Sequence, residues 1–547
     1  MNKALHRGED TPVAVAPPSA TVNPIADRAA FDAARAACQA DPGAFHGEIA
    51  RRNLHWFVPE LGARGAWIRF DPDARRWTGW DAVTAEPVAP DLPADFAPWT
   101  RAFVDDDAPI FRWFDGGLTN AGFNEVDRHV LAGRGDEPAF IFEGDRWDQS
   151  LHGGRGGPVV EITVSRKRLL LEVARAGIVL QSLGLKRGDR IALNMPNIPE
   201  QLYYTEAAKR LGILYTPVFG GFSDKTLSDR IHDSGARVVI TADGGFRNAQ
   251  IIPFKKVYTD AALDNYVPVA DALMVLEAEL GRLMAPDAAA VVLRHAREAL
   301  AGEITVERSD VMRGVGAALA ELVDRAALDS EAASGVRTAV ARALVAAPPR
   351  VEAVVVVRHT GQADVQWRAE RDRWSHELMA AATARLLDAA RAQGHSATDE
   401  AALLALPDQD FVRAVWAAAP AAPLDAEFPC FIIYTSGSTG KPKGVVHVHG
   451  GWLSGVIETL RVAFDASPGD VLYVVADPGW ITGQSYMIAG ALGAGVTSIL
   501  AEGAPLFPNA GRFAATIARY GVDIFKAGVT FLKAVMQDSQ NAEDVRA

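Results

Sequence analysis

The sequence has 547 residues, of which 49% are apolar, and its formal net charge at pH 7 is −13. This length predicts two or three structural units with a large core. The acidic balance and the lack of basic clusters argue against nucleic-acid partners, so any phosphate site must be a local positive spot. No stretch is long and apolar enough to span a membrane, and the N-terminus has no apolar signal region. Two distant cysteines, Cys38 and Cys430, suit a reducing compartment, so we predict a cytoplasmic protein without a disulfide.

The N-terminal quarter of the sequence divides into three segments. Residues 1–24 are rich in Pro, Ala and Thr, which predicts disorder. Residues 27–40 have the apolar spacing of an amphipathic helix. Residues 44–103 contain many Trp and Pro residues and little periodicity, so residues 25–137 are predicted to form an irregular cap over a larger body. The aromatic and His residues of 120–129 are interpreted as packing, because they lack metal-ligand spacing.

Strand and helix patterns alternate between residues 138 and 263. The predicted strands are 139–142, 190–193, 213–218 and 237–241, and the predicted helices are 164–183, 198–211 and 229–234. This alternation predicts a mostly parallel sheet with helices on both faces. Ligands of such sheets bind beyond the carboxyl ends of the strands, where Gly220-Gly221 and the turn 243–247 lie. Tight turns without a ligand would explain these glycines equally well.

Two segments interrupt the α/β pattern. Residues 264–349 are rich in Ala, Leu and Arg and predict an inserted helical subdomain. Its apolar residues fall on common helical faces: Leu273, Leu276, Leu280 and Leu283 on one, and Val315, Leu319 and Leu322 on another. Residues 350–380 are predicted to belong again to the α/β core, with a strand at 354–358. Residues 381–420 are predicted to form a second insertion that ends in a Pro/Ala linker. We interpret both insertions as packing elements rather than cofactor sites.

The segment 421–547 begins with an apolar run that leads into Tyr434-Thr-Ser-Gly-Ser-Thr-Gly-Lys-Pro-Lys-Gly444, followed by two valines. This pattern predicts a strand, a loop and a second strand. Glycine backbone N–H groups, hydroxyls and lysines together suit phosphate, although a polar hairpin with solvated lysines is the alternative. The loop is not the P-loop of the NTPases, because Pro442 follows Lys441 and Thr435 occupies the position of the first glycine.

Three further strands are predicted after this loop, at 471–475, 496–500 and 522–525. The first runs into the stretch Asp477-Pro-Gly-Trp-Ile-Thr-Gly-Gln-Ser-Tyr486, for which a core Trp at a strand end is the simplest explanation. His447 and His449 are predicted on one face of a strand. Such a pair can bind metal, but no third ligand is evident, so we predict no protein-held metal.

Residues 434–444 resemble the signature loop of the adenylate-forming superfamily, which includes acyl-CoA synthetases, luciferases and peptide-synthetase adenylation domains. In that family the loop clamps the β- and γ-phosphates of ATP. The resemblance implies the fold of the family's N-terminal domain and assigns phosphate binding to Thr435, Ser436, Gly437, Ser438, Thr439, Gly440 and Lys443. Thr435 and Lys443 are the implied catalytic groups.

Residues 53–258 and 351–535 resemble the short-chain branch of the acyl-CoA synthetases, which act on acetate or propionate. The resemblance implies an acyl pocket walled by Trp480 and Ile481, with Thr482 near the carboxylate or the path of the CoA thiol. It implies CoA binding by Phe219, Gly220, Gly221, Arg247 and Thr482. The chain departs from the branch at Gln250, where a second arginine is common, and at Gln484, where histidine is common. An extra amide at 484 would suit a hydroxylated acid.

The two insertions resemble those of the ligase part of propionyl-CoA synthase, a fusion protein whose ligase part acts on 3-hydroxypropionate. The resemblance implies AMP-forming activation of a short-chain acid through an acyl-adenylate, with ATP, CoA and Mg²⁺. The implied acid is 3-hydroxypropionate, or else propionate or acetate. The alternatives are a non-catalytic nucleotide or CoA binder and a scaffold that docks partners through its insertions.

The family's acidic residue near Mg²⁺, ribose-binding aspartate, hinge and C-terminal lysine lid domain are not found before Ala547. We therefore expect an N-terminal part of a longer polypeptide that lacks the lid domain and has little or no activity alone. The expected partners are a small carboxylic acid and the C-terminal domains of the same polypeptide, with a homo-oligomer formed through the full-length protein.

Overall fold

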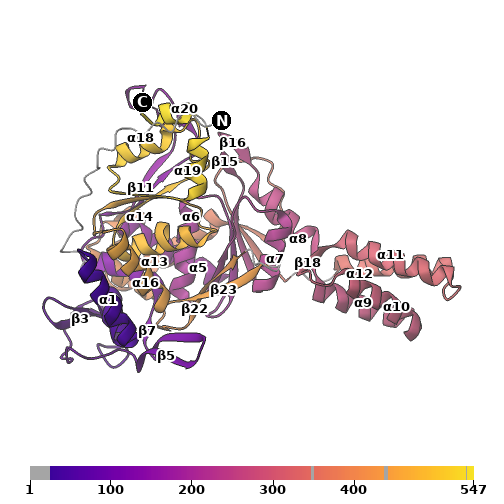
Figure 1. Ribbon diagram of the computed structural model, residues 1–547, viewed down its shortest axis with the longest axis horizontal. Helices are drawn as coiled ribbons and strands as arrows, with labels where there is room; N and C mark the ends of the chain where they lie inside the picture. The colour runs from indigo at the N-terminus through magenta and orange to yellow at the C-terminus, as the bar shows by residue number, and fades with distance from the viewer. Residues whose placement is uncertain (1–24, 155, 347–349, 436–441, 538, 547) are drawn as a thin grey trace.

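The structure is a computed structural model that describes residues 25–154, 156–346, 350–435, 442–537 and 539–546. An α/β body lies at its centre, an N-terminal β-rich region covers one side, and a helical arm projects from the opposite side (Figure 1). The segment 1–24, predicted to be disordered, lies outside the described residues. This arrangement agrees with the predicted α/β class and with the predicted helical insertion.

A seven-stranded sheet forms the centre of the body. Its strand order is β20-β19-β14-β12-β13-β22-β23, and every neighbouring pair is parallel except β22 and β23. The strands are β12 (Arg190–Asn194), β13 (Leu214–Pro217), β14 (Val238–Ala242), β19 (Ala353–Val357), β20 (Asp372–Trp374), β22 (Pro429–Thr435) and β23 (Lys443–Val448). The nearly continuous apolar sequences of β14 and β19 are buried throughout, as expected for strands covered on both faces.

A second, five-stranded sheet has the order β11-β8-β25-β24-β26. Only the pair β11–β8 is antiparallel. The strands are β8 (Pro138–Glu143), β11 (Glu161–Ser165), β24 (Val471–Val475), β25 (Thr497–Ala501) and β26 (Ile524–Ala527). The predicted strands of the body are therefore confirmed, and they divide between two sheets rather than one.

Helices α5 (Arg166–Ser182) and α6 (Pro199–Leu211) pack against each other and share one apolar core with both sheets. The Ser165 side chain caps α5 by accepting the Arg168 N–H group, and Gly212, at φ 69°, ends α6. Helix α7 (Asp224–Ser234) covers the seven-stranded sheet, begins five residues before the predicted start at 229 and is capped by Ser223. The prediction missed this cap residue.

Further helices of the body pack against both sheets, and Figure 1 labels α8, α16, α18, α19 and α20 among them. They are η1 (Phe123–Asp127), α3 (Arg128–Leu131), α4 (Leu151–Gly154), η2 (Lys255–Asp260), α8 (Ala261–Asp264), α16 (Gly451–Ala463), η3 (Gly483–Gly490), α17 (Ala491–Ala494), α18 (Gly511–Tyr520), α19 (Val529–Met536) and α20 (Ser539–Arg546). Two short antiparallel ribbons complete the body: β9 (Trp147–Asp148) with β10 (Gly157–Pro158), and β15 (Gly245–Arg247) with β16 (Gln250–Ile252). The glycine-rich turn predicted at 243–247 is thus partly a strand.

The body buries a network of charges. The Lys209 ammonium group lies 2.6 Å from a Glu125 carboxylate oxygen and 2.8 Å from one of Glu206, and all three side chains are fully buried. Arg210 pairs with Asp127 in the same region, also without exposure. Burial and the nearby Glu206 charge raise the pKa of Glu125 well above its usual range. This network joins α6 to η1.

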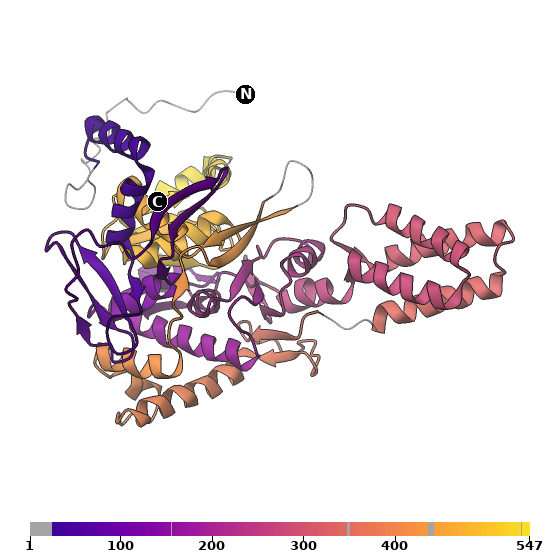
Figure 2. The same cartoon turned by 90° about the horizontal axis from the view of Figure 1, so that it is seen from below.

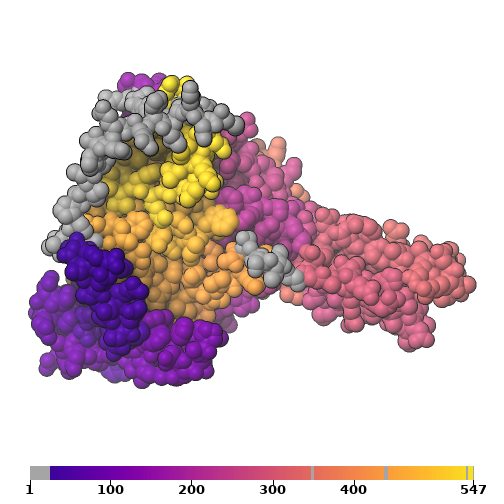
Figure 3. All heavy atoms as spheres, viewed as in Figure 1, coloured from indigo at the N-terminus to yellow at the C-terminus, as the bar shows by residue number. Residues whose placement is uncertain are grey.

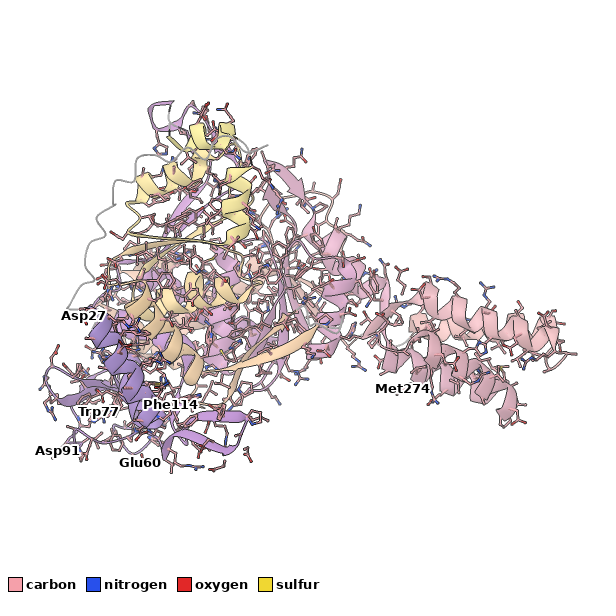
Figure 4. The ribbon with its side chains drawn as sticks, viewed as in Figure 1. Asp27, Glu60, Trp77, Asp91, Phe114 and Met274 are labelled. Atoms are coloured by element: carbon pink, nitrogen blue, oxygen red, sulfur yellow. The ribbon has the colours of Figure 1, made fainter. Side chains whose placement is uncertain are left out.

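The N-terminal region is regular, so the prediction of an irregular cap was wrong. Helices α1 (Arg28–Ala40) and α2 (Pro42–Asn53) precede a six-stranded antiparallel sheet of order β21-β7-β1-β2-β3-β4. Its strands are β1 (Trp56–Val58), β2 (Ala66–Asp71), β3 (Arg76–Asp81), β4 (Pro87–Val88), β7 (Leu118–Thr119) and β21 (Leu424–Asp425), and β5 (Arg101–Asp107) pairs with β6 (Ile110–Asp115) beside it. The aromatic residues Trp77 and Phe114 are buried here (Figure 4). The strands β2 and β3 are short and rich in Trp, Arg and Asp, so they lack the apolar alternation by which a strand is predicted.

The helical arm consists of α9 (Val269–Leu283), α10 (Pro286–Ala299), α11 (Arg308–Asp324) and α12 (Ser330–Ala346). It stands clear of the body in Figures 2 and 3 and has an apolar core of its own. The predicted core positions Leu276, Leu280, Val315 and Leu319 are buried, whereas Leu283 keeps 37% of its surface exposed. Two short paired strands, β17 (Tyr266–Pro268) and β18 (Thr305–Glu307), lie at its root.

Residues 381–420, predicted as a second insertion, are mostly helical. Helix α13 (Ser375–Ala392) runs across the predicted boundary at residues 380 and 381, and α14 (Glu400–Leu404) and α15 (Asp408–Ala418) follow it. Helices α13 and α15 pack against each other and against α5. Among the described residues, none of the helices has both the length and the apolar character needed to cross a membrane.

Candidate functional site

Strands β22 and β23 hold the two described ends of the predicted phosphate loop. Thr435 pairs directly with Lys443, and both residues are exposed. The next pair inward is Tyr434 with Gly444, where an added Cβ would lie 3.3 Å from the Tyr434 ring. The two predicted catalytic groups therefore lie side by side. The other predicted phosphate ligands, Ser436, Gly437, Ser438, Thr439 and Gly440, lie outside the described residues.

Helix α7 supports the base of this hairpin. The Tyr434 hydroxyl group donates a hydrogen bond of 2.7 Å to the Asp233 carboxylate. Burial, followed by this hydrogen bond, raises the pKa of Tyr434 above its usual value, so its hydroxyl stays protonated. The Arg230 guanidinium carbon lies 5.3 Å from the centre of the Tyr434 ring. Figure 1 shows α7 beside β23.

Arg230 also contacts the predicted CoA-binding turn. Its guanidinium carbon lies 4.5 Å from the centre of the Phe222 ring. The Phe222 ring in turn meets the Trp480 ring edge-on, with centroids 5.5 Å apart. Phe219 completes the aromatic group, 5.3 Å from Phe222 and 6.0 Å from Trp480. The hairpin base, the CoA-side turn and the acyl motif are thus joined by one continuous row of side-chain contacts.

The acyl motif touches the CoA-side turn through a glycine. A Cβ added at Gly479 would lie 2.5 Å from the Phe219 Cα atom, so only glycine permits this approach of the two backbones. The Gly479 N–H group donates a hydrogen bond of 2.7 Å to the Asp477 carboxylate. This bond holds the turn that carries Trp480.

Asp477 lies at the carboxyl end of β24 and is half-buried. Removal from water raises the pKa of Asp477 to about 7, against the opposing effects of the Gly479 N–H group and the Arg247 charge. Arg247 itself is exposed at the end of β15. The Asp477 carboxyl group therefore changes its charge near neutral pH. That charge interacts with the charge of Arg247, which is predicted to bind CoA.

Two buried carboxylates from the five-stranded sheet hold the β15–β16 ribbon that carries Arg247. Asp145 accepts the N–H groups of Asn248 and Ala249 at 3.2 and 2.6 Å, and Glu502 accepts the Phe246 N–H group at 2.8 Å. Glu502 also lies 2.8 Å from the His359 ring nitrogen. Arg247 is thus placed by contacts from both sheets.

The remaining predicted CoA residues form an open turn. A Cβ at Gly220 would lie 2.8 Å from the Phe254 ring, and one at Gly221 would overlap the Phe219 ring. Side chains at these positions would displace the rings. Packing against these two rings therefore requires glycine at both positions, and CoA binding here stays a prediction.

The predicted acyl-pocket residues lie at the surface. Trp480 and Ile481 keep 43% and 41% of their surface exposed, and Thr482 is half-buried. Gln484 is fully buried: its amide oxygen accepts the Tyr215 hydroxyl at 2.8 Å and its amide nitrogen donates to the Pro478 carbonyl at 2.6 Å. Gln484 therefore supports the turn from beneath and does not present its amide to a substrate.

The two histidines after the loop occupy different settings. His447 stacks on Phe431 with centroids 4.6 Å apart, and His449 is fully buried just beyond the end of β23. Burial lowers the pKa of His449 to about 3, so its ring is neutral. In the described part of the chain, no group of three or more His, Cys, Asp or Glu side chains is placed to hold a metal ion.

The prediction from sequence missed the residues that join the motifs. Arg230 and Asp233 lie on a helix that was predicted, but no function was predicted for either residue. Asp145 and Glu502 were likewise not predicted to have a function. Their partners are backbone N–H groups or aromatic faces far away in sequence, which no local pattern reveals. Asp477 had a local signal, since Asp-Pro-Gly is a turn sequence.

Comparison with known proteins follows this geometry. The family described as AMP-binding enzyme matches residues 128–281 and 336–547, and the residues 282–335 between the two matched segments lie within the arm. Acetyl-coenzyme A synthetase 2 of Pseudomonas aeruginosa is 32% identical over 426 residues, which cover 78% of this chain and 46% of the relative.

Two further relatives give the same result. The acetyl-coenzyme A synthetase of Burkholderia thailandensis is 31% identical over 448 residues, covering 82% of this chain and 49% of the relative. The acetyl-coenzyme A synthetase of Streptomyces coelicolor is 33% identical over 432 residues, which cover 78% of this chain and 46% of the relative. The chain spans about half the length of these curated relatives. From the family match and these relatives, the chain belongs to the AMP-binding enzymes, the adenylate-forming family that its eleven-residue loop resembles.

Proposed function

We propose that the protein is an ATP-dependent, AMP-forming acyl-CoA synthetase that acts on short-chain carboxylic acids. The observation that carries this proposal is the continuous row of contacts from Tyr434 through Arg230 and Phe222 to Trp480. An acid must lie beside the nucleotide phosphates in one step and beside a thiol in the next. Contacts that join all three motifs hold them near one another, which supports that requirement.

The proposed reaction has two displacements. A carboxylate oxygen attacks the α-phosphorus of ATP, and the bond to pyrophosphate breaks. The CoA sulfur, after losing its proton, attacks the acyl carbon, and AMP leaves with the bonding electron pair. Negative charge grows on phosphate oxygens in the first step, so hydrogen-bond donors directed at them give the largest stabilisation.

The proposed phosphate site is the loop between β22 and β23. Lys443 supplies a compact positive charge and Thr435 a hydroxyl donor, and their direct pairing places both at one end of the hairpin. Ser436, Gly437, Ser438, Thr439 and Gly440 are proposed to add hydroxyl and backbone donors. Mg²⁺ is proposed as the ion that ATP carries, which neutralises phosphate charge.

The proposed CoA site combines Phe219, Gly220, Gly221 and Arg247, with Thr482 on the thiol side. The open glycine turn suits close approach of a nucleotide, and the exposed Arg247 suits a phosphate. Gln250 offers no second charge on the same ribbon. We therefore expect Arg247 to account for most of the charge attraction to CoA there.

The proposed acid is 3-hydroxypropionate, with propionate and acetate as the alternatives. Trp480 and Ile481 are bulky and suit a small acyl group, and the relatives are named for acetyl-CoA. The preference for 3-hydroxypropionate rests on the resemblance of the insertions. Because an apolar pocket separates such acids by only about 1–3 kcal/mol per methylene, the three acids should be compared side by side.

Single-turnover formation of acyl-adenylate, followed by pyrophosphate release, tests the proposal in the natural polypeptide that contains this chain. We expect Lys443→Ala to slow this step by about 100-fold or more, because a charge-assisted donor to the phosphates is lost. Lys186→Ala, an exposed lysine in the turn before β12, should leave the rate unchanged. Equal rates for the parent and Lys443→Ala would refute the assignment.

Protection of the hairpin provides a test that does not depend on turnover. ATP should slow amide exchange in β22 and β23, and CoA should slow exchange around Phe219 and Arg247. Protection without turnover of any acid would favour a non-catalytic nucleotide or CoA binder. Protection by neither compound would contradict both functions.

The cellular setting is part of the same proposal. We propose that the chain acts in the cytoplasm, together with C-terminal domains of the same polypeptide and within a homo-oligomer of it. A scaffold role is supported by the arm, which projects from the body with its own core. Removal of the arm would distinguish that role, since catalysis should survive while assembly changes.

A further inference from the structure

A cavity of about 240 Å³, which we call the junction cavity, lies at the root of the helical arm, where α7 and α8 meet the arm (Figure 1). Its volume is far above the roughly 10–15 Å³ that one water molecule needs, and slightly below the about 300–1,000 Å³ of pockets for drug-sized ligands. The lining comes from both the body and the arm. The junction cavity therefore has room for a small organic molecule.

One part of the wall is apolar. Leu263 at the end of α8 and Val267 of β17 line the cavity at the root of the arm, and Ala272, Val275 and Leu344 line it from α9 and α12. Apolar side chains around a cavity favour a hydrocarbon group over water. A ligand of this cavity should therefore carry an apolar chain.

Another part of the wall carries arginines. A guanidinium nitrogen of Arg350 lies 2.8 Å from an Asp271 carboxylate oxygen, and Arg368 pairs with the Asp264 carboxylate. Arg308, the first residue of α11, donates only to the backbone carbonyl of Asp264, and among the described residues no carboxylate lies within ion-pair distance of it. The Nε atoms of Arg308 and Arg368 are buried and likewise have no hydrogen-bond partner in the described part of the chain. The wall thus holds a positive charge without a direct counter-charge.

The remaining ionisable groups of the wall do not supply that counter-charge. Arg371 is occupied by Asp260 and Asp372, at 2.6 and 2.9 Å. Glu370 is exposed. Burial lowers the pKa of His232 to about 4, so its ring is neutral. Because guanidinium groups are donors only, the ligand has to bring the acceptor oxygens.

We propose that the junction cavity binds a small carboxylate with an apolar chain, and that the carboxylate pairs with Arg308. The carboxylate oxygens accept guanidinium N–H groups, and the chain packs against Leu263 and Val275. A neutral ligand of the same shape leaves the charge of Arg308 unpaired, and a cation is repelled. The lining shares no residue with the proposed phosphate, acyl or CoA sites, so this inference does not depend on the proposed function.

Calorimetric titration of the natural polypeptide with hexanoate, 1-hexanol and hexylamine tests the proposal. We expect hexanoate to bind about tenfold or more tightly than 1-hexanol, because only hexanoate gains a charge-assisted hydrogen bond, and hexylamine not to bind. Arg308→Gln should weaken hexanoate binding by about tenfold and leave 1-hexanol binding unchanged. Arg325→Gln, which changes an exposed arginine just after the other end of α11, is the matched control and should keep the hexanoate Kd of the parent.

A second variant tests the cavity without removing a charge. Val275→Phe fills space beside the apolar wall, so it should weaken the binding of both hexanoate and 1-hexanol while every arginine stays in place. Hydrogen exchange locates the ligand: hexanoate should slow exchange in residues 261–275 and at the start of α11, and not in residues 477–482. Melting temperatures of all variants show whether each one is folded.

Each outcome bears on the proposal. The same hexanoate Kd in the parent and in Arg308→Gln, or no hexanoate binding to the parent, would overturn it. If Arg308→Gln is unfolded, the proposal stands or falls with the hexanoate affinity of Val275→Phe. Protection confined to residues 477–482 would place the acid in the proposed acyl site and would also overturn the proposal. Acyl-adenylate formation is measured separately, so failure of the proposed function is a different result from the loss of hexanoate binding at the junction cavity.

Discussion

The body and the arm are stabilised in different ways. The core of the body joins both sheets with α5 and α6, and it encloses charges such as Lys209 and Arg210. The described helices of the arm bury only apolar residues, and their ion pairs lie at the surface, as with Arg297 and Glu277. Because their cores are separate, the two parts should respond separately to mutation, and the proposed site belongs to the body.

The largest effect is expected from the buried charges of the body. Lys209→Met should lower the free energy of unfolding by about 3–5 kcal/mol, because Glu125 and Glu206 would lose their partner inside the protein. Denaturant unfolding measures this. In the arm, Arg297→Ala removes a surface pair and should cost only about 0–1 kcal/mol. Similar values for the two variants would break the comparison.

The core of the arm gives the next largest effect. Leu276→Ala should cost about 2–5 kcal/mol, because it leaves a cavity among fully buried side chains. Hydrogen exchange should increase in α9 to α12 and stay unchanged in α5 and α6. Met274 projects from the surface of α9 with 67% exposure (Figure 4), and Met274→Ala should change stability by less than about 0.5 kcal/mol. Faster exchange in α5 would show that the two cores are coupled.

The body should also respond to pH at Asp477. Its raised pKa means that the protonated form stabilises the fold, fully below about pH 4, and that this contribution is lost as the pH rises to about 7. The Asp477→Asn variant carries no ionisable group there and does not lose this contribution. The free energy of unfolding of the variant minus that of the parent should therefore increase from about pH 4 to about pH 7 and then stay constant. We expect a gain of about 1–3 kcal/mol, reduced by solvent because the residue is half-buried.

Thermal unfolding at pH 4, 5.5, 7 and 8 measures this difference. Arg297→Ala, on the arm, should show no comparable trend with pH. A difference between parent and Asp477→Asn that stays constant with pH would contradict the assignment of the titration to Asp477.

The smallest effect concerns the joint between the two parts. Thr305 at the root of the arm donates its backbone N–H and its hydroxyl to Asp229 of α7, at 3.0 and 2.6 Å. Thr305→Val removes the hydroxyl bond and should cost about 0.5–1.5 kcal/mol. Unfolding of the variant checks this value. A much larger loss would show that the joint, rather than the two separate cores, determines stability.

Much of the body could be predicted from sequence because its signals are local. The strands β12, β14 and β24 are short apolar runs, and the helices between strands have clear periodicity and end at glycine. The division into two sheets was not predictable, because β8 pairs with β25, which lies far away in sequence. Strand pairing over such separations leaves no trace in one sequence.

The candidate site divides in the same way. Thr435, Lys443, Gly220 and Trp480 belong to motifs that can be recognised in sequence. Arg230 and Glu502 could not be assigned from sequence, because their roles depend on rings and N–H groups brought together only by the fold. The regular N-terminal sheet was missed because its strands are short and rich in Trp, Arg and Asp.

The chain enters the arm beside Asp271 and leaves it at Arg350, and a guanidinium nitrogen of Arg350 lies 2.8 Å from an Asp271 carboxylate oxygen. The two ends of the arm are therefore adjacent, so with respect to the body the arm is a surface insertion whose ends are held close together. The entropy of closing a loop grows only slowly with its length. Such a junction tolerates exchange of the arm for a shorter or longer segment at little cost to the fold, which makes it a natural place for grafting another module.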